Sequence, residues 1–222
     1  MYLPPHFAET RPAILHDLIT AHPLGTLVTL GSTGLDANHL PFEFDPAPTA
    51  TAPHGTLLAH VARANLLWRD HAGTADVLAI FQGPQAYITP SWYTSSKPAH
   101  GQVVPTWNYC TVHAHGPLVI HDDPAWLLAL VTRLTARHEA SRTAPWSVSD
   151  APANFIAKQL AAIVGLEIPV TRLVGKWKVS QNRPPADRAG VVAGLAAAAT
   201  PDALAMARLV TDPTPSATRP AP

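Results

Sequence analysis

The sequence predicts a mainly β, α+β protein in which short antiparallel strands close into a barrel and helices lie at its periphery. Short apolar segments with strand-like alternation recur between turn residues, and the helical segments do not alternate regularly with them. The chain also has no glycine-rich phosphate loop of either common type. These observations favour a barrel over a doubly wound parallel sheet.

The first elements are a helix and a β-hairpin. Thr10 is positioned to cap the helix, which we expect to end before Pro23. Its apolar residues repeat at helical spacing: Ile14, Leu15, Leu18 and Ile19. Residues 26–30 and 37–44 then predict two strands, joined by a turn at Ser32-Thr33-Gly34.

The next part of the chain predicts two strands separated by a short helix. Residues 46–53 have the composition of a variable loop, and residues 56–62 predict a strand followed by a helix that reaches about His71. Residues 76–88 predict a long strand bent at Gly83-Pro84. Residues 89–100 are polar and rich in turn formers, so we expect a loop where ligand contacts concentrate.

The second half of the chain predicts a strand, two helices and two further strands. Residues 107–121 resume as a strand, and residues 124–142 predict an amphipathic helix. Its apolar residues are Trp126, Leu127, Leu130, Val131 and Leu134. A shorter helix is expected over residues 154–160. Alternation at Leu166, Ile168 and Val170, and then Leu173 and Val174, predicts strands that end near Lys178.

Residues 1–198 are expected to form a single domain. Residues 199–222 are expected to hold the remnant of a helix and then a tail rich in Pro, Thr, Ser and Ala, a composition typical of disorder.

Composition restricts the functional classes. Lys plus Arg and Asp plus Glu are 15 each, so the chain lacks the basic surplus of most DNA-binding proteins, and direct DNA binding is disfavoured. No run approaches the ~18 apolar residues of a membrane-spanning helix, and the first residues do not resemble a signal peptide. We therefore expect a cytoplasmic protein without membrane contact. The one cysteine, Cys110, is expected to be a small buried hydrophobe.

Five stretches combine His, Arg, Asn, Trp and Gly in a way that a plain barrel does not require. They are Asn38-His39-Leu40-Pro41, His60-Val61-Ala62-Arg63-Ala64-Asn65, Phe81-Gln82-Gly83-Pro84-Gln85-Ala86-Tyr87, Pro105-Thr106-Trp107-Asn108-Tyr109, and Lys176-Trp177-Lys178-Val179-Ser180-Gln181-Asn182-Arg183.

In this order, and together with the segment Tyr87-Ile88-Thr89-Pro90-Ser91-Trp92-Tyr93, these stretches resemble the PaiB family of FMN-binding negative transcriptional regulators. The similarity runs from Met1 to about Leu195. It departs from the family pattern at Leu66, where a proline commonly follows the asparagine. The resemblance implies a split β-barrel of the FMN-binding type, a homodimer, and a cofactor held in the cleft between two chains.

The same resemblance leaves two cofactors open. One is FMN, in a protein with a redox or regulatory role. The other is heme b, because the piperazate synthases, a branch of this family, use heme to join two nitrogens of an N-hydroxylated amino acid. In that branch the axial iron ligand is the histidine that His60 matches. A DNA-binding repressor is a third hypothesis, which the neutral charge disfavours.

His60 and Arg63 are the candidate catalytic residues. On a strand, His60 shares a face with Leu58 and Ala62, so its imidazole either enters an apolar cofactor cleft or bonds to the backbone within the core. Arg63 suits an FMN phosphate, a heme propionate or a substrate carboxylate, or else packs on the surface. Asn65 either contacts the cofactor or caps the short helix.

The other candidate cofactor-binding residues supply flat faces, hydrogen bonds and positive charge. Aromatic rings suit a flat cofactor, but they more often belong to a barrel core or a dimer interface. The basic residues suit anionic groups, or else form a solvated rim. The set is His39, Trp92, Thr106, Trp107, Asn108, Lys176, Gln181 and Arg183.

Overall fold

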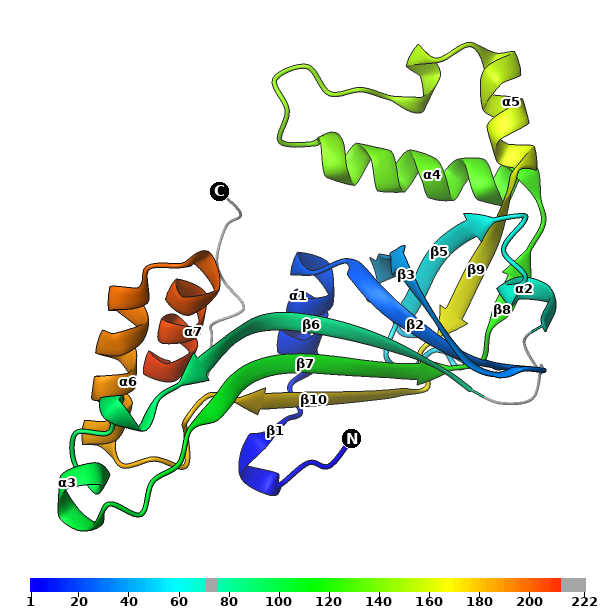
Figure 1. Cartoon of the computed structure of the whole chain (residues 1–222). Helices are drawn as coiled ribbons and strands as arrows, with labels where there is room; N and C mark the ends of the chain where they lie inside the picture. The colour runs from blue at the N-terminus through cyan, green and yellow to red at the C-terminus, as the bar shows by residue number, and fades with distance from the viewer. Residues whose placement is uncertain (71–75, 213–222) are drawn as a thin grey trace. The chain divides into compact units, whose positions relative to one another are not determined.

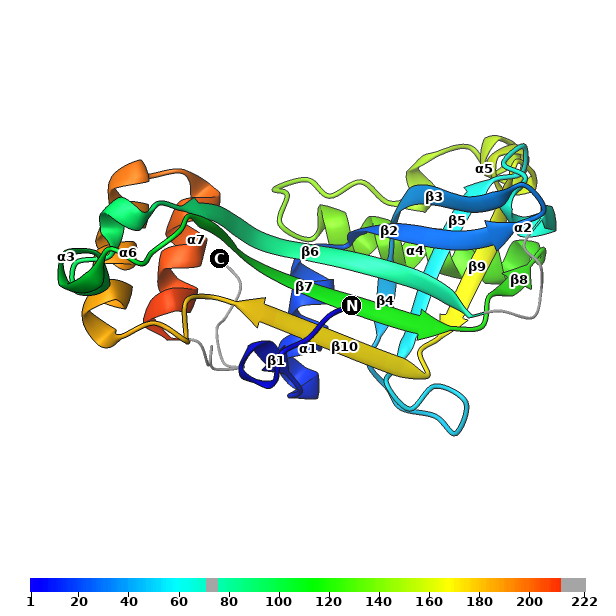
Figure 2. The same cartoon turned by 60° about the horizontal axis from the view of Figure 1, so that its bottom comes forward.

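The computed structural model describes residues 1–70 and 76–212, and these residues form two compact units (Figure 1). The first unit comprises Met1–His22, Gln82–Val112 and Val174–Pro222, and the second comprises Pro23–Phe81 and His113–Leu173. The strands are antiparallel and the helices lie outside the sheets, as Figure 2 also shows. The fold-class prediction, mainly β with peripheral helices, is confirmed. The single domain expected over residues 1–198 stays a prediction.

The second unit begins with the predicted hairpin. Strands β2 (Leu24–Gly31) and β3 (Gly34–Pro41) pair in register from Leu24 opposite Pro41 to Gly31 opposite Gly34. Gly34 has a φ of 113°, which favours glycine at the end of the turn. The second strand was expected to reach residue 44. It ends at Pro41 because proline lacks an N–H, and the chain then enters the separate strand β4 (Glu43–Asp45).

A four-stranded sheet in order β4-β5-β9-β8 also belongs to this unit. Strand β5 (Thr56–Ala62) has the predicted bounds and pairs along its whole length with β9 (Ile163–Pro169). The predicted strand over residues 107–121 is divided into β7 (Thr106–Gly116) and β8 (Val119–His121), with Pro117 in the break.

Helix α4 (Pro124–Glu139) covers this sheet and is followed by the turn η3 (Val148–Asp150) and helix α5 (Ala153–Ala161) (Figure 1). The Asp123 side chain accepts the Trp126 N–H at 2.9 Å and so caps α4. Leu130 and Leu134 pack on Leu58 of β5. The short helix α2 (Leu67–Asp70) follows β5, as predicted.

In the first unit, the hydrogen-bonded order is β1 (Ala8–Glu9), β10 (Arg172–Lys178), β7 and the later part of β6 (Val77–Ile88). Helix α1 (Pro12–Ala21) follows η1 (Pro5–Phe7) and β1. Its predicted apolar residues are buried, but Thr10 does not cap it. Arg11 holds the cap position without a side-chain bond, because a guanidinium has no acceptor for the N–H groups of the first turn.

The segment expected as a loop over residues 89–100 holds two short helices, η2 (Pro90–Trp92) and α3 (Ser96–His100). Helices α6 (Pro185–Ala198) and α7 (Pro201–Thr211) pack side by side (Figure 1). Helix α7 lies after residue 198, where the sequence predicted the remnant of a helix. Asp187 of α6 accepts hydrogen bonds from Ser95 and Ser96 and ties α3 to α6. The tail prediction beyond residue 212 falls outside the described residues.

Two further expectations concern the burial of Cys110 and membrane-spanning helices. Cys110 is 1% exposed, so the prediction that it is a small buried hydrophobe is confirmed. Among residues 1–70 and 76–212, no helix has both the length and the apolar composition that crossing a membrane requires.

We expect Gly194→Ala to destabilise the protein by about 1–2 kcal/mol, although alanine favours a helix by ~1 kcal/mol. A Cβ atom at Gly194 of α6 would lie 2.2 Å from Cε2 of Trp92, so overpacking outweighs the helix preference. Urea unfolding measures the change. The control, Ala196→Gly, lies on the exposed side of α6 and reports helix preference alone. A stabilised Gly194→Ala variant would contradict the packing.

Candidate functional site

His60 lies in the predicted orientation, on the face of β5 that carries Leu58 and Ala62. It lines a cavity of about 290 Å³ between β5, α4 and α5. The cavity walls are mostly apolar, and two of the aromatic side chains that line it, Trp146 and Phe155, are 47% and 50% exposed. The imidazole therefore borders a largely apolar space that is partly open to solvent.

The hydrogen bonding of the His60 imidazole is incomplete. Its Nδ1 atom is buried and has no hydrogen-bond partner. A buried polar atom without a partner costs about 1–3 kcal/mol, and this nitrogen is free to bond to a ligand. Burial lowers the pKa of His60, which keeps the ring neutral and able to donate a lone pair at neutral pH.

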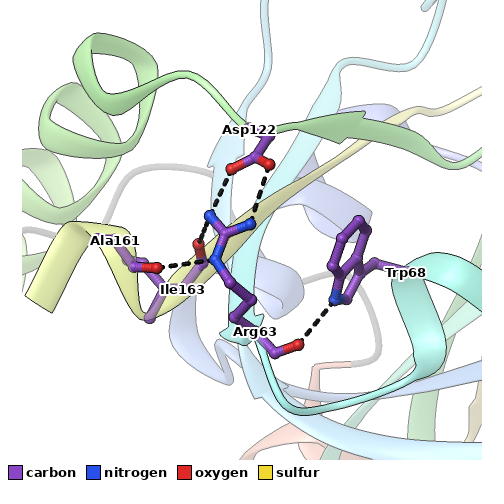
Figure 3. A network of polar contacts seen from close by, with 5 residues as sticks. All are labelled: Arg63, Trp68, Asp122, Ala161 and Ile163. Carbon is purple, nitrogen blue, oxygen red and sulfur yellow. Dashed lines mark hydrogen bonds and ion pairs between the residues drawn. The ribbon is translucent and has the colours of Figure 1, made fainter.

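Arg63 follows the end of β5 and forms a fork of internal contacts. Figure 3 shows its guanidinium pointing at Asp122, with Nη1 donating to Oδ2 at 2.9 Å and Nη2 donating to Oδ1. Nε donates to the Ala161 carbonyl at 2.7 Å, and Nη2 also donates to the Ile163 carbonyl at 3.1 Å. One guanidinium thus joins three segments of the second unit.

These segments carry the walls of the His60 cavity. Asp122 immediately precedes the cap of α4, while Ala161 ends α5 and Ile163 begins β9. The hydrogen bonds with Asp122 raise the pKa of Arg63 and lower the pKa of the carboxyl group. An anion-binding role for Arg63 stays a prediction, and a ligand would have to share the guanidinium with these partners. The observed geometry makes Arg63 a positioning residue for the cavity.

Asn65 and His39, the other candidates in this unit, lie apart from the cavity lining. The Asn65 Oδ1 atom accepts the Leu67 N–H at 2.9 Å, which is the capping alternative, and its Nδ2 atom donates to Asn38 at 2.7 Å. His39 is exposed on β3 opposite Thr26. A ligand contact for either residue stays a prediction.

The first unit gathers a second set of candidates into a basic cluster of Lys176, Lys178 and Arg183. Burial lowers the pKa of Lys178, and the charges of Lys176 and Arg183 lower it further against an opposing effect of Tyr109. Within the described part of the chain, no carboxylate forms an ion pair with any of the three. Three adjacent cations without a counter-ion are typical of an anion-binding site.

Aromatic rings adjoin this basic cluster. The Lys176 Nζ atom lies 5.3 Å from the centre of the Tyr109 ring, and Arg183 lies over the Tyr93 ring at 4.6 Å. Trp107 shares a strand face with Tyr109, and its ring meets that of Tyr87 edge-on at 6.1 Å. Trp107 is 52% exposed and Tyr87 is 50% exposed, so their ring faces are accessible.

The remaining candidates of the first unit already have partners within the chain. Thr106 accepts a hydrogen bond from Lys178, and the buried Asn108 donates to Ser180 at 2.9 Å. Gln181 bonds to the backbone at Val179 and Trp177. The Trp92 ring packs against α6. Their roles in ligand binding stay predictions. Their observed partners are all residues of this unit.

Lys178 and Tyr87 were not among the predicted site residues. Lys178 could have been found from its spacing, because residues two apart on a strand share a face and Lys176 was already a candidate. Tyr87 lies in two of the stretches that carry the family resemblance, but its spacing did not pair it with Trp107, which lies on another strand. No group of three or more His, Cys, Asp or Glu side chains suited to a metal ion occurs within residues 1–70 and 76–212.

Comparison with known proteins identifies related chains. A family model described as "Putative FMN-binding domain" matches residues 1–172. The protease synthase and sporulation protein PAI 2 of Bacillus subtilis is 32% identical over 212 residues, which cover 96% of this chain and 97% of that protein. An uncharacterized protein of Emericella nidulans is 35% identical over 225 residues, covering 87% of this chain and 90% of the relative.

Solved structures with the same fold are more distant in sequence. The conserved hypothetical protein Rv2991 of Mycobacterium tuberculosis has a TM-score of 0.54 at 14% identity and covers 83% of this chain and 94% of its own. The FAD and heme binding protein of Mycobacterium smegmatis has a TM-score of 0.54 at 16% identity, over 77% of this chain and 73% of its own. These likenesses confirm the predicted split-barrel fold.

We expect His60→Gln to weaken the dependence of stability on pH. The pKa of His60 is lower in the folded state than its unfolded value of about 6.5, so the unfolded chain binds the proton more tightly. The contribution of His60 to the free energy of unfolding is therefore complete above that value, and it is lost as pH falls from about 6.5 towards the folded pKa. One proton limits the effect to about 1.4 kcal/mol per pH unit.

Urea unfolding at several pH values between about 4.5 and 7.5 measures this slope. The control is Thr135→Val, which changes the same cavity wall without removing a titratable group. An unchanged slope in His60→Gln would show that this imidazole does not lose its proton-binding strength on folding.

Proposed function

The chain belongs to the family of FMN-binding domains, and on this premise we propose that it binds FMN on the basic, aromatic sheet face of its first unit. In this proposal the bound flavin serves a redox or regulatory role. The observation that carries the proposal is the cluster of Lys176, Lys178 and Arg183 without a counter-ion among the described residues.

This cluster fits the phosphate of FMN. A phosphate dianion accepts several charge-assisted hydrogen bonds, and each is worth about 1.5–3 kcal/mol. Arg183 is suited to bidentate contact, while the lysines act as point charges. Burial lowers the pKa of Lys178, and the positive charges of Lys176 and Arg183 lower it further, so an anion placed among them would relieve their mutual repulsion.

The adjoining aromatic side chains fit the flavin ring. Tyr87 and Trp107 expose about half of their surface and present flat, polarisable faces. Trp107 shares a strand face with Tyr109, whose ring lies 5.3 Å from the Lys176 Nζ atom. A flavin bound there supplies hydride and electron transfer chemistry. The contribution of the chain is to hold the phosphate and to orient and partly desolvate the ring.

We propose that a second copy of this chain packs over the exposed face of the bound flavin ring. Tyr2 is 84% exposed, and its ring lies 5.8 Å from the Lys176 Nζ atom, so the aromatic surface extends beyond Tyr87 and Trp107. Exposed apolar surface of this kind is typical of an interface. A homodimer would shield the flavin from water, in agreement with the expectation from the sequence.

We expect Lys178→Met to weaken FMN binding about tenfold or more and to leave riboflavin binding unchanged, because riboflavin has no phosphate. Quenching of flavin fluorescence measures both affinities. The control Lys158→Met removes the same charge from an exposed position on α5. Equal losses for FMN and riboflavin would contradict a phosphate role for the cluster, and no binding of either flavin would refute the proposal.

Heme is a second candidate, favoured by the unpartnered Nδ1 atom of His60 in its apolar cavity. A neutral imidazole is a common axial ligand, and the mostly apolar walls suit a porphyrin edge. The fold also occurs in a protein named for binding both FAD and heme. In this alternative, the protein would be an enzyme that acts on the N–O bond of an N-hydroxylated amino acid and joins two nitrogens.

The size of the cavity ranks heme below FMN. Its volume of about 290 Å³ lies just below the range for sites that enclose drug-sized ligands, roughly 300–1,000 Å³. The cavity therefore holds only the edge of a macrocycle unless its walls separate. Arg63 joins those walls, so heme uptake would depend on the hydrogen bonds that the guanidinium makes.

If His60 ligates heme, we expect a Soret band with added hemin that is lost in His60→Gly and restored by free imidazole. The imidazole enters the space left by the side chain and replaces the missing ligand. Absorption spectroscopy measures the band, and His39→Gly, an exposed histidine of β3, is the control. A spectrum that does not change in His60→Gly would exclude His60 as the ligand.

A further inference from the structure

A further cavity lies within the first unit, between α1, α7 and the sheet. Its volume is about 300 Å³, and the largest contributions to its lining are apolar side chains. Leu18 of α1, Trp177 of β10 and Leu209 of α7 represent the three walls. Because Trp177 alternates with Lys176 and Lys178 along β10, this cavity and the basic cluster use opposite faces of the same strand.

Two opposite charges stand at the rim of this cavity. Asp17 of α1 and Arg208 of α7 are both exposed lining residues. They do not pair with each other, and neither side chain has a hydrogen bond or an ion pair within the described part of the chain. A positive and a negative group therefore border one apolar space without neutralising one another.

We propose that this cavity binds a free α-amino acid with an apolar side chain. The ligand carboxylate would meet Arg208, its ammonium would meet Asp17, and its side chain would displace water from the apolar walls. A fatty acid or a simple amine would satisfy one rim charge and leave the other facing a like charge. The zwitterion is the ligand class that complements both.

The dimensions and chemistry of the cavity agree with this ligand. A space of about 300 Å³ corresponds to about ten water-sized groups of ~30 Å³, which is the size of leucine or phenylalanine. Cys110 also lines the cavity, but burial raises the pKa of its thiol, so the site is suited to reversible binding and not to thiolate chemistry.

The site depends on a part of the chain that the family model does not include. Ala205, Arg208 and Leu209 of α7 form one wall, whereas the match to the FMN-binding domain ends at residue 172. Helix α7 packs on α6 through Ala203, Met206 and Val210, which leaves the face with Arg208 directed to the cavity. The proposal is independent of the FMN proposal because the cavity and the basic cluster lie on opposite faces of β10.

Isothermal titration calorimetry with the full chain tests the proposal. The probes are L-leucine, L-phenylalanine, 4-methylpentanoate, which lacks the ammonium of leucine, and 3-methylbutylamine, which lacks its carboxylate. We expect the amino acids to bind and each single-charge analogue to bind about tenfold more weakly or worse. An analogue that binds as tightly as leucine, or a protein that binds none of the probes, would overturn the proposal.

Variants of the rim identify the contacts. Arg208→Gln should weaken the binding of leucine but not the binding of 3-methylbutylamine. Asp17→Asn should weaken the binding of leucine but not the binding of 4-methylpentanoate. Both residues are exposed, so these changes leave the fold intact. Arg133→Gln on α4 is the charge control. If the control loses leucine binding, or if both rim variants bind leucine as tightly as the unchanged protein, the ligand binds elsewhere.

A third variant tests the cavity itself. Ala205→Trp should fill the space and abolish binding, whereas the matched change Leu204→Trp lies on the exposed side of α7 and should leave binding unchanged. Circular dichroism checks that both variants are folded. Leucine binding that survives Ala205→Trp in the folded protein would refute the assignment to this cavity.

Discussion

The hydrogen bonds of Arg63 are the constraint on which the second unit depends. One guanidinium joins the end of β5 to Asp122 before α4 and to the carbonyls where α5 ends and β9 begins (Figure 3). These segments carry the walls of the cavity that contains the partly unsatisfied His60. An arginine suits this task because its planar fork offers five donors at fixed angles, which a lysine does not.

The candidate sites of the two units suit different kinds of ligand. In the second unit, burial keeps His60 neutral beside an apolar space, so the site suits a ligand that needs a lone pair. In the first unit, Lys176, Lys178 and Arg183 have no counter-ion among the described residues, so the site suits an anion beside aromatic rings. Local electrostatics therefore separates the two cofactor hypotheses that share the same family motifs.

Sequence periodicity predicted most elements because burial imposes it. Strand β5 and helices α4 and α5 were found from alternation and helical spacing, and His60 was assigned to its correct face. Failures occurred where an element has weak periodicity. Helix α6, which was not predicted, is rich in alanine, and its buried apolar residues Val191 and Leu195 give only a short pattern.

By itself, the sequence determined the family, the fold class, the single buried cysteine and the residue types available for a cofactor. Only the tertiary structure decided how those residues are used. Arg63 was assigned to an anion from its chemistry, yet its partners lie 59 and 98 residues further along the chain. For Lys176, Lys178 and Arg183, only the structure shows that no carboxylate of the described chain pairs with them, which supports the proposed anion site. Spacing along a chain fixes which face a residue occupies, whereas packing of distant segments fixes its partners.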